Sequence, residues 1–218
     1  MTMDAKESII KELTIFNHVG NKIQTEDREI NIIARLAEPL IVVLGNVLSD
    51  EECDELIRLS KERLQRSKIG ASRKIDEIRT SKGMFFQDAE NELIARIEKR
   101  VASIMNIPVE HAEGIHVLQY KIGQEYKPHF DYFSSTDAQE NNRLSSLVMY
   151  LNDDVEKGGE TIFPHLKFSV SPQKGMAVYF EYFYNDSSLN ELTLHGGSPV
   201  IKGEKWVATQ WMRRQRIR

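Results

Sequence analysis

The second half of the chain has a strand-like pattern that strongly limits its fold. From about residue 115 onward, apolar residues alternate with polar ones or gather in short runs between glycines and polar turns. A period of two is typical of strands with one buried face. The predicted strands are 114–120, 126–132, 144–151, 160–164, 176–180, 192–195 and 205–212. Short strands at this spacing favour a jelly roll of two packed sheets.

Two amphipathic helices are predicted ahead of these strands. Ser49 and Glu52 form a capping box, which begins a helix that runs to about Gln65. Asp88 is expected to cap a second helix over about 89–106, with apolar residues at helical spacing. Their apolar stripes need a surface to pack against, so we expect an α+β, mainly β fold with the N-terminal helices packed on one sheet.

The chain length of 218 residues is suited to one domain. We divide this single domain, 1–218, into an N-terminal extension (1–37), a helical support region (38–112) and the jelly-roll core (113–213) with the candidate metal site. Within the support region, Pro39 begins a predicted strand over 38–44, which is rich in β-branched residues.

The composition excludes several classes of partner and of location. The net charge of -4 gives no general attraction to nucleic acid or to an anionic membrane. No apolar run reaches the roughly 18 residues of a membrane span. The N-terminus is polar and Cys53 is the only cysteine. We therefore expect a cytoplasmic protein, without disulfides, whose metal ligands are histidines and carboxylates.

One strand segment carries a pair of potential metal ligands. His129 and Asp131 are two residues apart, so a strand directs both to the same face while Phe130 points away. An imidazole and a carboxylate suit a divalent cation, and a second histidine would complete the facial triad typical of non-haem Fe(II) oxygenases. The tripeptide alone is weak evidence, because such spacing also occurs by chance at polar strand ends.

His195 is the strongest candidate for the third ligand. It ends an alternating segment and precedes Gly196 and Gly197. The other histidines fit a core or surface role better, and they are His18, His111, His116 and His165.

Lys205 begins the last predicted strand. Alternation places Lys205, Val207, Thr209 and Trp211 on one face of this strand, and both of its faces have the composition of a buried face. A buried lysine requires an anion. Two interpretations stay open on the residues alone: Lys205 points into water beside Glu204, or it pairs with a bound carboxylate.

These residues resemble the Fe(II)/2-oxoglutarate-dependent dioxygenases, specifically the prolyl 4-hydroxylase family with its collagen-type catalytic domain. The resemblance covers about residues 38–213, in order. Four blocks carry it: 79–85 (RTSKGMF), 126–131 (YKPHFD), 158–164 (GGETIFP) and 195–206 (HGGSPVIKGEKW).

The resemblance implies a double-stranded β-helix and a specific catalytic site. His129, Asp131 and His195 would hold Fe(II), and Lys205 would bind the 5-carboxylate of 2-oxoglutarate. The other residues that would contact or line the cosubstrate pocket are Tyr120, Thr161, Thr209 and Trp211. O2 and L-ascorbate complete the expected cofactors.

The reaction that the resemblance implies is a procollagen-proline 4-dioxygenase-like one. Decarboxylation of 2-oxoglutarate to succinate and CO2 would be coupled to hydroxylation of peptidyl proline at C4. The lysine anchor resembles that of collagen-type enzymes, whereas related demethylases and oxygen-sensing hydroxylases use arginine. The chain resembles a small bacterial-like form, with a homodimer left open.

The substrate would be a proline-containing peptide or protein, collagen-like sequences included. Its expected contacts are Tyr126, Tyr132, Phe133 and Arg143, with residues 68–83 and 132–142 closing over it. Two alternatives stay open: a hydroxylase of a free amino acid or other small molecule, and a non-catalytic metal-binding jelly roll.

Overall fold

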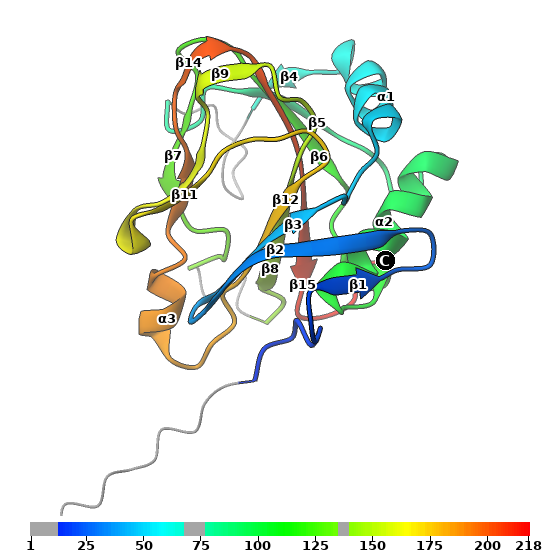
Figure 1. Cartoon of the computed structure of the whole chain (residues 1–218), viewed down its shortest axis with the longest axis vertical. Helices are drawn as coiled ribbons and strands as arrows, with labels where there is room; N and C mark the ends of the chain where they lie inside the picture. Colours follow the sequence, from blue (N-terminus) through cyan, green and yellow to red (C-terminus); the bar gives the residue numbers. More distant parts are fainter. Residues whose placement is uncertain (1–12, 68–76, 135–139) are drawn as a thin grey trace, which may run out of the picture.

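The computed structural model describes residues 13–67, 77–134 and 140–218. These residues form two facing sheets, with the two long helices on one side (Figure 1). The large sheet has the strand order β1 (Lys22–Gln24), β2 (Glu29–Ala37), β3 (Leu40–Gly45), β12 (Ala177–Glu181), β8 (Arg143–Tyr150), β15 (Lys205–Arg213), β6 (His116–Tyr120), β5 (Lys82–Phe85) and β4 (Gln65–Arg66). The small sheet has the order β11 (Phe168–Val170), β10 (Thr161–Phe163), β13 (His195–Gly197) and β7 (Tyr126–His129). The predicted jelly roll is confirmed.

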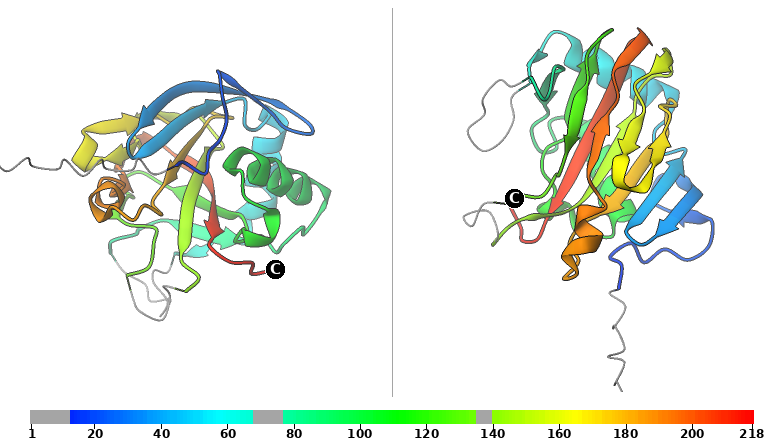
Figure 2. Two further views of the ribbon diagram at one scale, coloured as in Figure 1. Left: turned by 90° about the horizontal axis from the view of Figure 1, so that it is seen from below. Right: turned by 90° about the vertical axis from the view of Figure 1, so that its left-hand side faces the viewer.

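The remaining elements cover or connect the sheets. Strands β9 (Val155–Gly158) and β14 (Val200–Gly203) form a two-stranded ribbon at the top of Figure 1. Helices α1 (Asp50–Lys61) and α2 (Glu92–Met105) lie beside the large sheet (Figure 2), and α3 (Ser187–Glu191) precedes β13. Short 3-10 turns span Val109–His111 and Pro164–Leu166. No helix in the described residues is long and apolar enough to cross a membrane.

The alternation of the central strands separates two hydrophobic cores. On β15, Trp206, Ala208 and Met212 pack in the core that contains Leu56 of α1 and Ile97 of α2. The opposite side chains face the small sheet, where a second core contains Val207 and Phe163 among others. The predicted alternation of the last strand is therefore confirmed, and the face that carries Lys205 lines the space between the two sheets.

The helix boundaries differ from the prediction in two places. The capping box at Ser49 is present, but the first helix ends at Lys61 rather than Gln65. The second helix is capped by Asn91, whose side chain accepts a hydrogen bond from the Ile94 amide, and the predicted cap at Asp88 is wrong. Asp88 instead forms an ion pair with Arg218, the last residue of the sequence.

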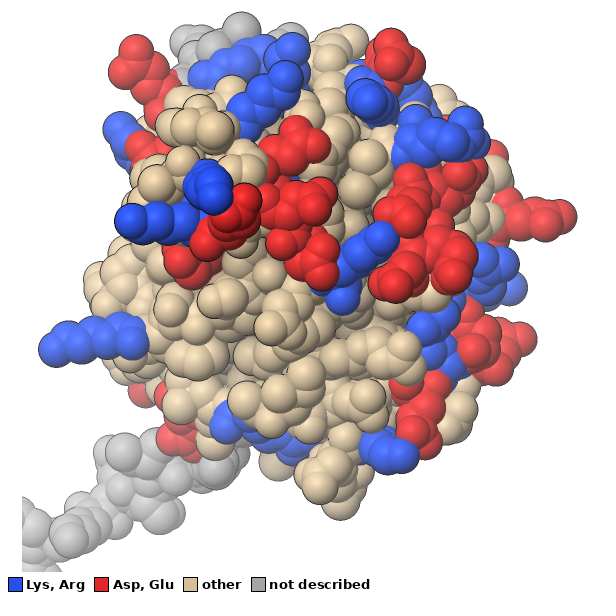
Figure 3. Space-filling view, turned by 45° about the horizontal axis from the view of Figure 1, so that its top comes forward, with Lys and Arg blue, Asp and Glu red and all other residues tan. Residues whose placement is uncertain are grey.

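Several strands were also shorter than predicted or were not predicted. Strand β7 ends at His129, so Asp131 lies just beyond it, and β13 begins at His195 instead of ending there. The unpredicted strands are mostly polar or short, namely β1, β2, β4, β5, β9, β11 and β14. Acidic and basic side chains are interspersed on the face shown in Figure 3, which fits the small net charge of -4.

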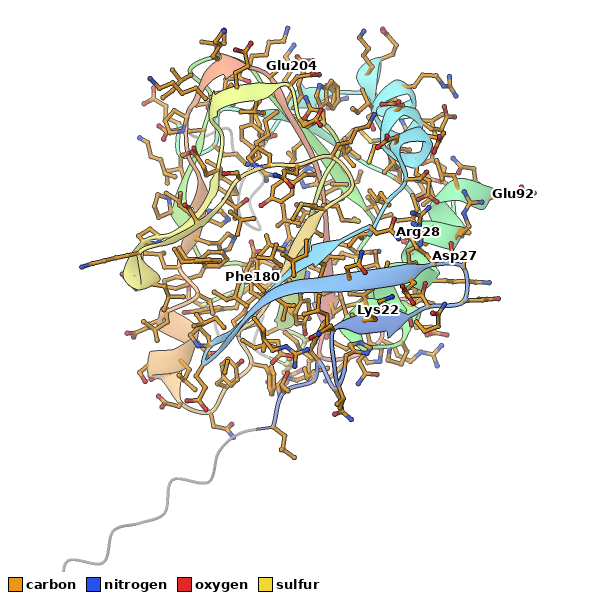
Figure 4. All side chains as sticks on the ribbon, viewed as in Figure 1. Lys22, Asp27, Arg28, Glu92, Phe180 and Glu204 are labelled. Carbon is orange, nitrogen blue, oxygen red and sulfur yellow. The ribbon has the colours of Figure 1, made fainter. Side chains whose placement is uncertain are left out.

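A buried ion-pair network joins the β1–β2 turn to both long helices. Arg100 of α2, with a side chain only 1% exposed, pairs with Asp27 and with Glu52 of α1. Arg28 lies 3.6 Å from Glu52 (Figure 4 labels Asp27 and Arg28 beside α2). Hydrogen bonds from Arg100 lower the pKa of Asp27. The pKa of Glu52 is lowered as well. Burial alone would raise it, but the hydrogen bonds from Arg100 and from the Ser49 amide have the larger effect.

We expect Arg100→Ala to lower the free energy of unfolding by about 3–5 kcal/mol, because it leaves Glu52 buried without its main partner. Urea denaturation at neutral pH measures this change. Lys22→Ala is the control, since the Lys22–Glu29 pair is exposed and is worth at most about 1 kcal/mol. The lowered carboxyl pKa values mean that the network stabilises the fold above about pH 4 and loses this effect as the pH falls. Equal losses in both variants would contradict the prediction.

Candidate active site

A pocket between the two sheets brings the predicted site residues together. Its polar and charged lining comes from both sheets and from the segment before β5, and its apolar wall comes from the large sheet, with Leu118, Val148 and Val207. The predicted residues that line it are Tyr120, Tyr126, His129, Asp131, Thr161, His195, Lys205, Thr209 and Trp211.

Strand pairing places the two histidines side by side. His195 of β13 and His129 of β7 are direct partners in the antiparallel ladder, and their ring centroids are 4.4 Å apart. Gly196 allows this close pairing, because a Cβ there would lie 2.7 Å from the Tyr126 carbonyl oxygen. Asp131 follows two residues after His129, and ligand atoms of all three residues lie within 4.8 Å of one another.

Backbone carbonyls orient both imidazoles for metal binding. His129 Nδ1 lies 2.9 Å from the Lys127 carbonyl oxygen, and His195 Nδ1 lies 3.0 Å from that of Thr193. A carbonyl oxygen only accepts hydrogen bonds, so Nδ1 carries the proton in each ring. Each Nε2 atom therefore directs its lone pair toward Asp131, whose carboxylate oxygens are 3.5 Å away. Metal-binding histidines commonly donate the ring N–H that is not at the metal to a backbone carbonyl, as both rings do here.

One oxygen of Asp131 is held by the large sheet, and the other is left for a ligand. Oδ2 accepts hydrogen bonds from Ser146 Oγ of β8, at 2.6 Å, and from Trp211 Nε1 of β15, at 2.8 Å. Tyr182 in turn contacts Ser146 Oγ at 2.9 Å. These contacts fix the carboxylate with Oδ1 directed at His129 Nε2.

The ionisation states of these residues suit a divalent cation. Burial lowers the pKa of His195 to about 4, so this ring is neutral at neutral pH. Hydrogen bonds from Ser146 and Trp211 favour the ionised form of Asp131. Two imidazole nitrogens and one carboxylate oxygen form the donor set of a facial triad, so the residues fit an Fe(II) ion.

Lys205 is a buried cation in the same pocket. The residue is 4% exposed, and within the described residues its Nζ forms no hydrogen bond or ion pair. Nζ lies 5.6 Å and 5.8 Å from the ring centroids of Tyr120 and Tyr150. Burial lowers the pKa of Lys205 to about 8, against a weak opposing effect of Glu160. Of the two interpretations from sequence, the solvent-exposed one is wrong.

The other predicted pocket residues surround Lys205 or the histidines. Tyr120 of β6 is the ladder partner of Lys205, and Thr161 of β10 accepts a 2.8 Å hydrogen bond from the Tyr150 hydroxyl. Thr209 and Trp211 follow on the pocket face of β15. The positions of Tyr120 and Thr161 suit hydrogen bonding to an anion at Lys205, which stays a prediction.

The four predicted substrate contacts lie in different surroundings. The ring centroid of Phe133 is 5.0 Å from the Arg143 guanidinium, and Phe133 is not part of the pocket lining. Tyr126 lines the pocket and stacks on His129 at 3.5 Å between centroids. Arg143 is paired with Glu113 and lies 3.9 Å from the Trp211 ring centroid. Tyr132 packs against Phe130 and Tyr182 and is not part of the pocket lining. Of the segments proposed to close over substrate, residues 68–76 and 135–139 lie outside the described residues.

Sequence analysis missed a second buried cation. Arg79, 6% exposed, lines the pocket, and its guanidinium lies 4.6 Å from the Tyr126 ring centroid. Backbone pairing between 78–80 and 125–127 holds it there. Arg79 is one of several basic residues in the segment 66–83, and nothing in the local pattern distinguishes it. Ser146 was also missed, although a serine inside an apolar strand is a visible signal.

Comparison with known proteins agrees with this geometry. The 2OG-Fe(II) oxygenase superfamily matches residues 115–213. Probable prolyl 4-hydroxylase 3 of Arabidopsis thaliana is 40% identical over 200 residues, which are 80% of this chain and 69% of the plant protein. Prolyl 4-hydroxylase 1 of the same plant is 42% identical over 199 residues, 81% of this chain and 70% of its own.

A solved structure is similar over most of its length. The collagen prolyl hydroxylase vCPH of Paramecium Bursaria Chlorella virus-1, in its 2OG complex, has a TM-score of 0.65 and 33% identity, and the match covers 79% of this chain and 95% of the viral one. Relatives at this level of identity and coverage define the family. The chain belongs to the prolyl 4-hydroxylases of the 2OG-Fe(II) oxygenase superfamily, and it is a dioxygenase that uses Fe(II) and 2-oxoglutarate.

Proposed function

We propose that this chain is a prolyl 4-hydroxylase that acts on proline in an extended peptide. His129, Asp131 and His195 would hold the iron, and Lys205 would pair with the distal carboxylate of 2-oxoglutarate. The observation that carries this proposal is the distribution of charge in the pocket: a buried ammonium, which has no anionic partner among the described residues, lies in the same pocket as an oriented His-Asp-His cluster. A site for a metal alone has no use for that ammonium.

In this proposal, the residues of the chain have two roles: they position the metal ligands, and they exclude water from the pocket. When bound, the iron and 2-oxoglutarate would use O2 to oxidise an unactivated C–H bond, with release of succinate and CO2. Thr193 and Lys127 carbonyls fix the histidine tautomers, and Ser146 and Trp211 fix the carboxylate. The apolar wall of Leu118, Val148 and Val207 keeps water from the reacting groups.

The substrate is proposed to be a proline-rich sequence, because such peptides are preorganised in a polyproline II helix and bind aromatic surfaces. Aromatic side chains at the pocket include Tyr126 and Trp211. The viral relative is named as a collagen prolyl hydroxylase, which makes Gly-Pro-Pro repeats the first peptides to test.

The test is 2-oxoglutarate decarboxylation with Fe(II) and ascorbate, with mass spectrometry of the peptide product. We expect slow turnover alone, faster turnover with Gly-Pro-Pro peptides, and a 16 Da gain at proline. Stimulation by free proline but not by peptides would favour the small-molecule hydroxylase. Absence of turnover with every substrate, in protein that binds the metal, would favour a non-catalytic domain and contradict the proposal.

The lowered pKa of Lys205 predicts a pH dependence of cosubstrate binding. Below about pH 8 the buried amine is already charged and can bind a carboxylate. Above this pH the neutral form dominates, so the apparent affinity for 2-oxoglutarate should fall by up to about tenfold per pH unit. KM for 2-oxoglutarate, measured from pH 6.5 to 9.5, should be flat and then rise.

Lys205→Arg is the matched control for this pH profile. Arginine is not deprotonated in this range, so the variant should lose the rise above pH 8 whatever its absolute KM. Parallel profiles in the two proteins would show that Lys205 is not the titrating group.

A further inference from the structure

An exposed aromatic ring lies at the end of a row of side chains that starts in the pocket. Phe85 of β5 pairs with His116 of β6, His116 with Thr209 of β15, and Thr209 with Val148 of β8. Direct ladder partners project to the same side of a sheet. Thr209 and Val148 line the pocket, so Phe85 lies on the same face of the large sheet, two strands away.

The inner side of Phe85 rests on a fixed support. Its ring stacks on the imidazole of His116 at 3.9 Å between centroids and an angle of 6°. His116 is buried, and its Nδ1 lies 3.4 Å from Arg79 Nη2. Gly83 leaves room for this arrangement, because a Cβ there would lie 2.8 Å from His116 Nε2. The ring of Phe85 is therefore held flat although the residue is 51% exposed.

The distance from Phe85 to the pocket matches the repeat of a polyproline II helix. Two strand spacings separate Phe85 from Thr209, which is about 10 Å. A polyproline II helix has three residues per turn and rises 3.1 Å per residue, so residues i and i+3 lie on the same side about 9 Å apart. A peptide that runs across the strands from the pocket toward Phe85 would therefore place the residue three positions from the target proline over Phe85.

We propose that the exposed ring of Phe85 is a subsite for the residue three positions from the target proline, and that this subsite prefers a prolyl ring. The inference rests on the proposed function and adds to it the position in the peptide that is read. A flat apolar ring offers no hydrogen bond donor or acceptor, so the subsite selects an apolar surface rather than a polar group. In a Gly-Pro-Pro repeat the residue three positions from any proline is again a proline.

The test measures peptide binding without turnover. Enzyme with Fe(II) and 2-oxoglutarate is kept anaerobic, and fluorescence anisotropy reports binding of labelled ten-residue Gly-Pro-Pro peptides with proline or alanine at position i−3 or i+3. Wild-type protein should prefer proline at one of these positions by roughly 2- to 12-fold, if packing of a prolyl ring on Phe85 is worth about as much as one aromatic pair.

Three variants make the result specific. Phe85→Ala should bind the proline and alanine peptides equally, whereas Phe85→Tyr should restore the preference. Ile33→Ala is the matched control, since Ile33 is 55% exposed on β2, near the other end of the large sheet. An unchanged preference in Phe85→Ala, or an equal loss of affinity for both peptides, would overturn the inference.

The same peptides in air separate this inference from the proposed function. Phe85-dependent preference in binding without any proline hydroxylation would support the subsite and contradict the hydroxylase proposal. Hydroxylation without the preference would do the reverse.

Discussion

Asp131→Ala is expected to lower 2-oxoglutarate turnover by more than about 100-fold, because loss of a partner that only orients a metal ligand already costs about 10- to 100-fold. The substitution removes the single anionic ligand of the cluster. It also leaves the Trp211 indole and the Ser146 hydroxyl without their acceptor. Turnover and bound metal, measured after equilibrium dialysis, should therefore fall together.

Two further variants test whether the loss of turnover in Asp131→Ala comes from the loss of a metal ligand. Ser146→Ala keeps the ligand but removes one of its two supports, so we expect a graded loss of about 10-fold in metal affinity. Asp153→Ala removes an exposed carboxyl outside the pocket and should have no effect. Full activity in Asp131→Ala would show that this carboxylate does not bind the metal.

Lys205→Ala is expected to raise KM for 2-oxoglutarate by tens- to thousands-fold, because truncating one partner of a buried charge pair costs about 2–5 kcal/mol. The metal cluster stays intact in this variant, so metal binding should change little. Separate titrations of Fe(II) and of 2-oxoglutarate distinguish the two effects.

The control for this variant is Lys202→Ala. Lys202 lies on β14, three residues before Lys205, and pairs with Glu156 at the surface. Exposed pairs of this kind contribute little, so KM should stay at its wild-type value. A variant at Lys205 with normal KM for 2-oxoglutarate would remove this residue from the cosubstrate site.

The residues that do the chemistry were easier to predict than the elements that carry them. Lys205 and Trp211 fall on one face of a long strand, and period-two alternation is enough to place them together. Local sequence and the resemblance selected His195 as the partner of His129, but their contact could not be derived from local sequence, because it depends on the register of β7 against β13. Register between distant strands is set by the whole sheet and not by local sequence.

The errors at the second helix have an identifiable cause. Asp88 and Asn91 are both good N-cap residues, and local sequence does not rank them. In the folded chain, Asp88 pairs with Arg218, and the Ala89 amide donates to Glu98. These contacts hold residues 88 and 89 out of the helix, and the φ of Ala89, 48°, is not helical. Tertiary contacts thus decide between two caps of similar strength.

The missed strands share a different property. Strands β9 (VEKG) and β14 (VIKG) are only four residues long, each ends in a glycine, and much of their surface is exposed. Alternation of apolar and polar residues is therefore weak in both strands, although they pair with each other as an antiparallel ladder. Arg79 was missed for a related reason: its burial comes from the cover provided by β7, and sequence alone shows a basic loop.

Because Asp131 is held by the large sheet, a bound metal would also stabilise the contact between the two sheets. Both histidines belong to the small sheet, whereas the aspartate is bonded to Ser146 and Trp211 of the large sheet. An ion bound to all three residues would link the small sheet to the large sheet. Loading the metal should then slow amide hydrogen exchange in β7 and β13 as well as raise the melting temperature.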